Sequence, residues 1–396
     1  MKTAQPEPPA RHWLDAWHVD PSANREYDFI DGLRGMAILM VLSCHYLYVN
    51  PKSGPAIHFL GSILGTLGSG VTLFFTISGF LIAWPFWKRK ANRSASVVPP
   101  GYGWRRFWKI YPPLALSILL LTPTYILWQG DATLFLQAAS QWLTGLAFVL
   151  PVSGRLNPVM WSLMVEVHFY LVLPLLFVLT KALSPRATLW TISAFFLVAP
   201  ILMQTLTGVA PTFFPQISDP FPAGLKPFCL GVFLAGIDNL GMWNRRWGKL
   251  GNLGWLLLPM GLLGQAWIDR NPNVHAPFLA ESFQWTFIIG AGCLLCHAAD
   301  PQNSRARWLC MPWLRWCGII SYEWYLFHQP MIYWSRGFFG PAGGGILKYI
   351  IIIGTPLVAS LVFSALIYRH FSLPILKYGR AKKSVQKIVN SKSGQN

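Results

Sequence analysis

Charged side chains are scarce in this chain. Asp, Glu, Lys and Arg make up 12% of its 396 residues and only 14 residues are acidic, whereas hydrophobic residues make up 53%. A soluble protein of this length needs many more charges to cover its surface, but a lipid-facing surface needs none. The composition therefore excludes a single large soluble core and predicts a membrane domain.

The sequence also lacks the cysteine spacing of a disulfide scaffold, because its six cysteines lie in or beside apolar runs. We interpret most of them as small core residues. Cys293, Cys296 and His297 do match the pattern of c-type haem attachment. The topology predicted below places this segment at the cytoplasmic end of a helix, where haem c is not attached, so we expect no metal site.

An apolar signal-peptide region is likewise missing from the start of the chain. We expect residues 1–28 to be a cytoplasmic lead-in, 29–370 to be the membrane domain and 371–396 to be a basic cytoplasmic tail. The cations of the tail are expected to lie on anionic lipid. They are Arg380, Lys382, Lys383, Lys387 and Lys392.

Long apolar runs dominate the rest of the chain and predict an all-α, polytopic membrane protein with ten transmembrane helices. The predicted spans lie near 35–50, 67–87, 107–128, 159–180, 188–206, 224–241, 250–268, 279–298, 317–337 and 346–369. The stretch 131–158 is apolar but interrupted by polar residues, which favours an interfacial or re-entrant helix on the outer side.

Lysines and arginines alternate between the two sides of these spans. All but six of the 32 fall on one side, and the other side holds only Lys52, Arg155, Lys226, Arg270, Arg336 and Lys348. The positive-inside rule then places both termini in the cytoplasm, in a multi-pass protein of the bacterial inner membrane. It also explains the net charge of +18 without nucleic acid as a partner, leaving membrane lipids instead.

Ionisable side chains inside apolar spans are costly, so each is a candidate for function. His45 follows Arg34 by eleven residues, which is three helical turns and about 16 Å along one face. A thioester carrier with anionic phosphates at one end, such as coenzyme A, would span that separation. His45 would serve as the base that activates an attacking hydroxyl. The alternative is a buried histidine satisfied by a nearby carbonyl group.

Four sequence blocks resemble motifs of the acyltransferase-3 family of membrane proteins. The first is Asp31-Gly32-Leu33-Arg34-Gly35 with His45, and the second is Phe74-Phe75-Thr76-Ile77-Ser78-Gly79-Phe80-Leu81-Ile82. The third is Trp161-Ser162-Leu163-Met164-Val165-Glu166-Val167-His168-Phe169-Tyr170 with Pro174. The fourth is Ser321-Tyr322-Glu323-Trp324-Tyr325-Leu326-Phe327-His328-Gln329-Pro330. All four occur in the family's order.

This resemblance implies ten helices, acyl-CoA as the donor substrate with no permanently bound cofactor, and transfer to a hydroxyl of a saccharide or glycoside. Arg34 and His45 would be the central pair. Where the family has Arg-x-x-Arg at the start of its third helix, this chain has Arg106 and Lys109. Both are candidates for binding the phosphates of CoA, although Lys109 lacks the guanidinium fork. The alternative for Lys109 is a basic flank beside lipid headgroups.

Three further ionisable residues carry different expectations. Glu166 would bind the acceptor hydroxyl or orient His45, unless it is half of a structural pair with Arg155 or another buried donor. His328 precedes Pro330 and is expected to be structural, held by backbone carbonyl groups freed near the proline. Glu323 receives no role.

A proton- or solute-coupled transporter is the main alternative function, because buried His, Glu and Arg also build proton relays. The spacing of Arg34 and His45 and the lack of inverted repeats with broken helices favour the acyltransferase. A non-catalytic envelope scaffold would leave His45 and Glu166 unexplained.

Overall fold

The structure, a computed structural model, describes residues 13–18, 28–47, 55–129, 132–145, 156–209, 220–243, 245–271, 277–299, 304–339 and 346–379. Regular structure in these ranges is helical, with no strand. The α-helices are α1 (Asp28–Tyr46), α2 (Pro55–Thr66), α3 (Gly70–Ala91), α4 (Tyr102–Gln129), α5 (Ala132–Leu143), α6 (Trp161–Leu179), α7 (Pro185–Val209), α8 (Pro220–Asn239), α9 (Arg245–Arg270), α10 (Pro277–Leu295), α11 (Pro312–Ile319), α12 (Ser321–Phe339) and α13 (Ile346–Ile367).

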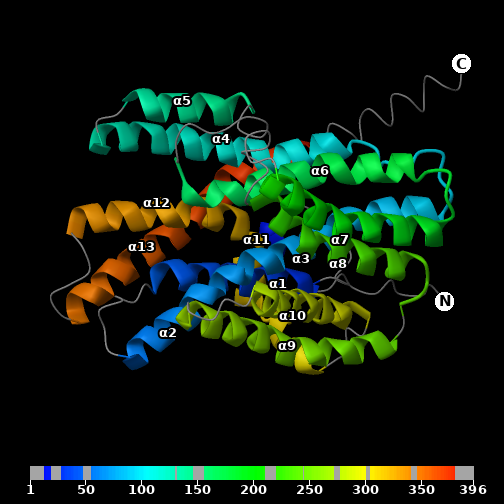
Figure 1. Ribbon diagram of the computed structural model, residues 1–396. Helices are drawn as coiled ribbons and strands as arrows, with labels where there is room; N and C mark the ends of the chain where they lie inside the picture. Colours follow the sequence, from blue (N-terminus) through cyan, green and yellow to red (C-terminus); the bar gives the residue numbers. More distant parts are fainter. Residues whose placement is uncertain are drawn as a thin grey trace, which may run out of the picture.

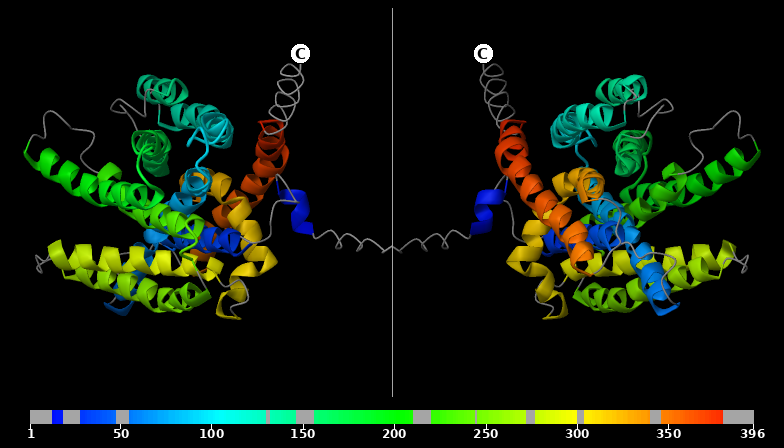
Figure 2. Two further views of the ribbon diagram at one scale, coloured as in Figure 1. Left: turned by 90° about the vertical axis from the view of Figure 1, so that its right-hand side faces the viewer. Right: turned by 90° about the vertical axis from the view of Figure 1, so that its left-hand side faces the viewer.

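The long helices lie alongside one another in one bundle (Figure 1). Helices α4 and α5 form one side of it and the α9–α10 pair forms the opposite side, with α1 and α3 between them, as the turned views also show (Figure 2). The central position of α1 and α3 brings their side chains next to those of α4, α6 and α12, which carry the other candidate site residues.

Each of the ten predicted spans overlaps at least one helix of the structure, although residues 48–50 of the first span lie outside the described residues. Within the described residues, four helical segments are long and apolar enough to cross a membrane: Leu60–Ala91, Pro158–Leu179, Phe278–Leu295 and Ile350–Gly379. The prediction of an all-α membrane protein is confirmed to this extent. The count of ten spans, the cytoplasmic termini and the bacterial inner membrane stay predictions.

Several boundaries differ from the prediction. Helix α1 begins at Asp28, before the predicted start near residue 35. Its first turns contain the polar residues Asp31 and Arg34, which interrupt the apolar periodicity used for the prediction. The structure adds α2 and a 3-10 turn, η3 (Leu67–Ser69), before α3, and it divides the predicted span 317–337 between α11 and α12. After α13, a π-helical turn η8 (Tyr368–Ser372) continues into a helix as far as Gly379. Helical structure therefore crosses the predicted boundary at 370, and the tail cations from Arg380 onward lie outside the described residues.

The stretch 131–158 is described in part. It contains α5, as a helix was expected there, and a 3-10 turn η5 (Pro158–Met160) that leads into α6. Residues 146–155 lie outside the described residues, so the expectation of an interfacial or re-entrant path stays a prediction.

Glycines let the central helices approach closely. A Cβ atom at Gly79 of α3 would lie 2.6 Å from the carbonyl oxygen of Phe228 in α8, closer than real Cβ contacts. On α1, a Cβ at Gly32 or Gly35 would collide with the backbone of Leu309 or Leu314. Small residues at helix interfaces of membrane proteins permit such backbone contact. The two glycines beside Arg34 thus pack this turn of α1 against the segment that leads into α12.

Lys90, at the end of α3, shows that the α3–α4 and α6–α7 connections lie at the same end of the bundle. Its buried Nζ atom donates to the carbonyl oxygens of Thr180, Lys181 and Leu183 at 2.8, 2.9 and 2.8 Å. These carbonyl groups follow the last turn of α6, where helical partners run out. The described N-terminal turn, residues 13–17, packs against the π-helical turn that follows α13, since the hydroxyl of Tyr368 donates to the carbonyl oxygen of Trp17 at 2.8 Å.

Candidate active site

Arg34 is held at the centre of the bundle by two contacts. Its Nη2 atom donates to Oγ of Ser321 at 3.0 Å, and its Nη1 atom lies 3.9 Å from the carboxylate of Asp31, one turn earlier on α1. Ser321 is buried at the first position of α12. The guanidinium therefore has a fixed position but keeps donors that these contacts do not use.

A cavity of about 420 Å³ opens beside Arg34. Four cationic side chains line it: Arg34, Arg105, Arg106 and Lys109. Asp31 and Glu323 are the carboxylates in its wall, together with apolar residues of α3 and the aromatic side chains of Trp108 and Tyr322. The excess of positive charge suits an anionic ligand.

Arg106 lies on aromatic faces in this cavity. Its guanidinium carbon is 5.8 Å from the ring centre of Tyr102 and 5.5 Å from that of Tyr170, within cation–π range. The Nε atom of Arg106 is buried and has no hydrogen-bond partner among the described residues. Buried donors are nearly always paired, so this donor points to a ligand that supplies an acceptor.

Lys109 and Arg34 also line a second, narrower cavity of about 70 Å³. Phe74, Ser78 and Tyr322 belong to the walls of both cavities, so the two spaces meet there. The predicted binding residues Arg34, Arg106 and Lys109 are thus gathered at the larger cavity, and two of them reach the entrance of the narrower one.

Glu166 lines the narrower cavity from α6. Its Oε1 atom accepts a 2.5 Å hydrogen bond from the hydroxyl of Tyr170, whose ring lies under Arg106. No hydrogen bond joins Glu166 to His45 in the part of the chain that the structure describes. The proposed partner Arg155 lies outside the described residues.

His45 contacts His328 directly. The Nδ1 atom of His45 lies 2.8 Å from Nε2 of His328, and the two rings stack with centres 5.0 Å apart. His328 is fully buried, whereas His45 is partly exposed. One of the roles predicted for Glu166 was to orient His45. In the structure, His328 occupies the position beside His45 from which this would be done.

The hydrogen bonds of His328 assign the protons of this pair. Its Nδ1 atom lies 2.8 Å from the carbonyl oxygen of Tyr325 and 3.2 Å from that of Trp324. Carbonyl oxygens only accept, so Nδ1 of His328 carries the proton, and burial favours a neutral ring whose Nε2 atom is an acceptor. His45 then donates from Nδ1, which leaves the lone pair of its own Nε2 atom free to take a proton.

Pro330 shapes this part of α12. Because proline has no N–H group, the carbonyl group of Leu326 has no helical partner, and Nδ2 of buried Asn157 donates to it at 2.7 Å. Asn157 also accepts from the backbone N–H of Val159 at the start of η5. The carbonyl group freed by the proline thus goes to Asn157, and His328 bonds to the two carbonyl groups of the preceding turn.

Sequence reasoning did not select Ser321 and Tyr325, and it treated His328 as structural. All three lie on one face of α12, because Tyr325 and His328 follow Ser321 by four and seven residues. Tyr325 also exchanges a 2.8 Å hydrogen bond with Ser162 of α6. The spacing of Ser321, Tyr325 and His328 was the feature of the sequence from which their common face could have been predicted. Glu323, which received no role, is a buried carboxylate in the wall of the larger cavity.

Comparison with known proteins identifies the family. Residues 27–369 match the family profile described as an acyltransferase domain, which covers most of the chain. The chain belongs to the acyltransferase-3 family. The resemblance found in the four sequence blocks is confirmed, and the bundle around His45 is a fold of this family of membrane acyltransferases.

Two relatives illustrate the range of this acyltransferase-3 family. The chain is 30% identical to acyltransferase MdmB of Streptomyces mycarofaciens, over 54% of this chain and 58% of that protein. It is 23% identical to peptidoglycan O-acetyltransferase OatA of Listeria monocytogenes, over 88% of this chain and 56% of that protein. The chain thus spans little more than half the length of these relatives. No solved structure matches it.

Proposed function

We propose that this protein transfers an acyl group from acyl-CoA to a hydroxyl group of a saccharide or glycoside at the bacterial inner membrane. The observation that carries the proposal is the contact between His45 and His328, which leaves Nε2 of His45 as an unprotonated base. A cationic cavity and a narrower, mostly apolar cavity that contains Glu166 lie on the adjoining helices. The family supplies the reaction type.

The cationic cavity is the proposed donor site. Arg34, Arg106 and Lys109 would contact the phosphates of CoA, with Arg106 offering its unpartnered Nε donor. Charge-assisted hydrogen bonds to phosphate are among the stronger polar contacts in proteins. The pantetheine arm would then extend past Phe74 and Ser78 into the narrower cavity.

The size of the narrower cavity favours a short acyl group. Its volume is about 70 Å³, about half that of an apolar cavity of roughly 150 Å³ that holds a benzene ring. An acetyl group fits such a space and a long acyl chain does not. The relative OatA is named an O-acetyltransferase, which agrees with an acetyl donor.

The proposed reaction is attack of a hydroxyl on a thioester. Nε2 of His45 takes the proton of the acceptor hydroxyl while its oxygen bonds to the thioester carbon, and the C–S bond then breaks. The CoA thiolate takes up the proton, which gives the ester and free CoA. His328 accepts the hydrogen bond from Nδ1 of His45 and so orients the ring and stabilises the imidazolium.

Glu166 is the proposed contact for the acceptor hydroxyl or for the thioester end of the donor. It lines the narrower cavity with Ser162 and Tyr325, and the backbone carbonyl oxygen of Tyr325 also accepts the hydrogen bond from Nδ1 of His328. Tyr170 holds the carboxylate in place from the following turn. Glu166 would therefore act beside the histidine pair without touching His45.

The test is transfer by the purified full-length protein in nanodiscs. With radiolabelled acetyl-CoA and saccharide acceptors that include peptidoglycan fragments and simple glycosides, we expect ester-linked label in the saccharide and release of one CoA per ester. His45→Ala should abolish both at unchanged protein abundance. A proton-coupled transporter would instead show proton flux in vesicles, with no CoA release, and that result would overturn the proposal.

A further inference from the structure

A third cavity, of about 200 Å³, lies between the start of α3 and the α9–α10 pair. It adjoins η3 and the end of α2, away from the connection between α3 and α4. Its polar lining consists of hydroxyl, amide and carboxylate side chains. They are Thr66, Ser69, Thr72, Gln265, Asp269 and Gln284.

Most of these polar groups lack protein partners. Among the described residues, no hydrogen bond or ion pair engages the side chains of Ser69, Thr72, Asp269 and Gln284. Polar side chains on transmembrane helices are expensive unless they are paired or line a functional space. Ser69, Thr72 and Gln284 are partly exposed and Asp269 is exposed, so these groups are open to a ligand that enters the cavity.

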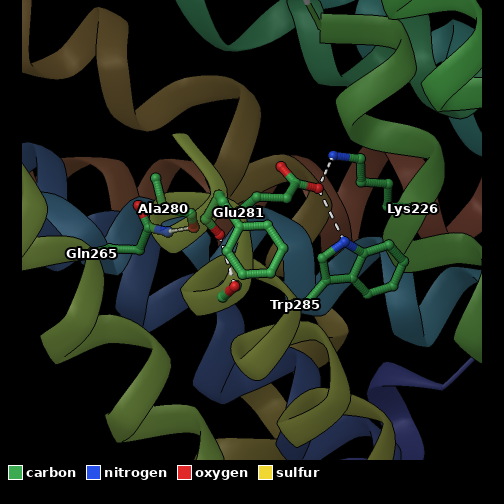
Figure 3. A network of polar contacts seen from close by, with 7 residues as sticks. Lys226, Gln265, Ala280, Glu281 and Trp285 are labelled. Atoms are coloured by element: carbon green, nitrogen blue, oxygen red, sulfur yellow. Dashed lines mark hydrogen bonds and ion pairs between the residues drawn. The ribbon is translucent and has the colours of Figure 1, made fainter. Parts of the chain in front are cut away.

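The α9–α10 wall of the cavity is held rigid by its own contacts. Nε2 of Gln265 donates to the carbonyl oxygen of Ala280 at 2.6 Å, which joins the end of α9 to the start of α10 (Figure 3). On the adjacent face of α10, Glu281 accepts from Lys226 of α8 and, at 3.0 Å, from Nε1 of Trp285 (Figure 3). The other polar groups of this wall are thus presented on a fixed scaffold.

The wall of the cavity contacts the helix that carries the proposed base. Sγ of Cys44, the residue before His45, donates to the carbonyl oxygen of Gly65 at 3.2 Å. Within the first turn of α3, Thr72 faces this cavity whereas Val71 faces the narrower donor cavity. The two spaces therefore lie on different faces of the first turn of α3.

The lining chemistry suits a neutral polyhydroxylated ligand. Sugar hydroxyls both donate and accept, and the amide of Gln284 and the carboxylate of Asp269 can each engage them. Among the described residues of the wall, the one charged group is the carboxylate of Asp269, which disfavours a phosphate or an anionic lipid headgroup. In the described part of the chain, no three His, Cys, Asp or Glu residues gather as a metal site would require.

We infer that this third cavity is an anchoring subsite for the acceptor saccharide, distinct from the donor cavities. The inference rests on the proposed transfer to a saccharide hydroxyl. One sugar unit of the acceptor occupies the cavity, and a neighbouring hydroxyl reaches His45 around the end of α1. The subsite thereby sets acceptor affinity and leaves CoA binding unaffected.

Gly65 offers a way to block the cavity without disturbing the packing. A Cβ atom at this position meets nothing within 4 Å, so Gly65→Leu would project into the space. Gly354 of α13 is the matched control, because a Cβ there also meets nothing within 4 Å and the residue lines none of the three cavities. Gln284→Ala is a second, smaller change that removes one unpaired amide.

The experiment measures base-labile acyl esters on envelope saccharides of a strain that lacks the gene and expresses each full-length variant. We expect the wild type and Gly354→Leu to restore the esters, and Gly65→Leu and Gln284→Ala to lower them at least tenfold and threefold, respectively. Binding of acetyl-CoA to the purified variants should stay within twofold of the wild type.

The other outcomes distinguish failure of the anchoring subsite from failure of the proposed function. If the wild type restores esters and both cavity variants match Gly354→Leu within twofold, the subsite is overturned and the proposed function stands. If the wild type restores none, the proposed function fails and the subsite fails with it. Loss of acetyl-CoA binding in Gln284→Ala at normal abundance would also overturn the subsite, because the cavity would then belong to the donor site.

Discussion

Nδ1 of His45 lies 2.8 Å from Nε2 of His328, and both carbonyl contacts of His328 fall on its other nitrogen atom. We predict that His328→Ala lowers kcat roughly 10- to 100-fold. Loss of the hydrogen-bond partner that orients a metal-binding histidine has an effect of this size in metalloenzymes. The KM for acyl-CoA should change less than twofold. Steady-state kinetics in nanodiscs would measure both.

His328→Gln is the conservative control for this prediction. The amide oxygen of glutamine can accept the hydrogen bond from Nδ1 of His45, so this variant should recover part of the lost kcat. A merely structural role would predict equal damage from both substitutions together with lower thermal stability. Wild-type kcat in His328→Ala would rule out the positioning role.

Arg34 is predicted to contribute mainly to donor binding. Arg34→Ala removes a charge-assisted contact, worth about 1.5–3 kcal/mol, so the Kd for CoA should rise roughly 10- to 150-fold. Ser321→Ala is the control, since it removes the 3.0 Å hydrogen bond that holds the guanidinium but keeps the charge. We expect its effect to be much smaller. Equal CoA affinity of Arg34→Ala and the wild type in calorimetry would contradict this role.

The contact between α3 and α8 is predicted to tolerate no added side chain. A Cβ atom at Gly79 would lie 2.6 Å from the carbonyl oxygen of Phe228, so Gly79→Val should destabilise the bundle by about 1–3 kcal/mol. Thermal unfolding in detergent would show a lower midpoint, while Gly354→Val, in open space on α13, should not. A midpoint equal to the wild type would mean that the two helices can separate without cost.

Much of this architecture was readable from the sequence, because a lipid environment makes long apolar runs strong signals. Every predicted span overlaps a helix, and Arg34, Arg106 and Lys109, which were predicted to bind one ligand, line one cavity. The starts of helices were harder to predict. Asp31 and Arg34 interrupt the apolar period, so the first span was predicted to begin near residue 35, whereas α1 begins at Asp28.

Pairing between distant helices was the part that the sequence could not supply. His45 and His328 are separated by 283 residues, and nothing in either segment indicates which buried group the other meets. The spacing of Ser321, Tyr325 and His328 predicts a common face on α12. That this face turns toward α1 depends on tertiary packing.

Membrane sidedness is a prediction that reporter fusions can test. Fusions after Arg93 and at the C-terminus should report a cytoplasmic position, whereas fusions near Asn273 and Ala342 should report an external one. The reason is the distribution of lysine and arginine between alternate sides of the spans. An external C-terminus would require an odd number of spans.

Lys109 is the position at which the chain departs from the family motif, and it lines both donor cavities. Lys109→Arg should keep or improve the use of acyl-CoA, since the guanidinium fork can contact phosphate at two points. Lys109→Glu replaces attraction by repulsion beside the phosphates, worth on the order of 1–3 kcal/mol, and should raise the KM for acyl-CoA roughly 5- to 150-fold. Acceptor kinetics should stay unchanged, because the effect falls on the donor.

Lys249→Glu, at an exposed lysine of α9 that lines neither donor cavity, controls for net charge and should leave donor KM within twofold. If Lys109→Glu behaves like Lys249→Glu in saturation kinetics, Lys109 is a flank that faces lipid headgroups and the donor phosphates bind elsewhere.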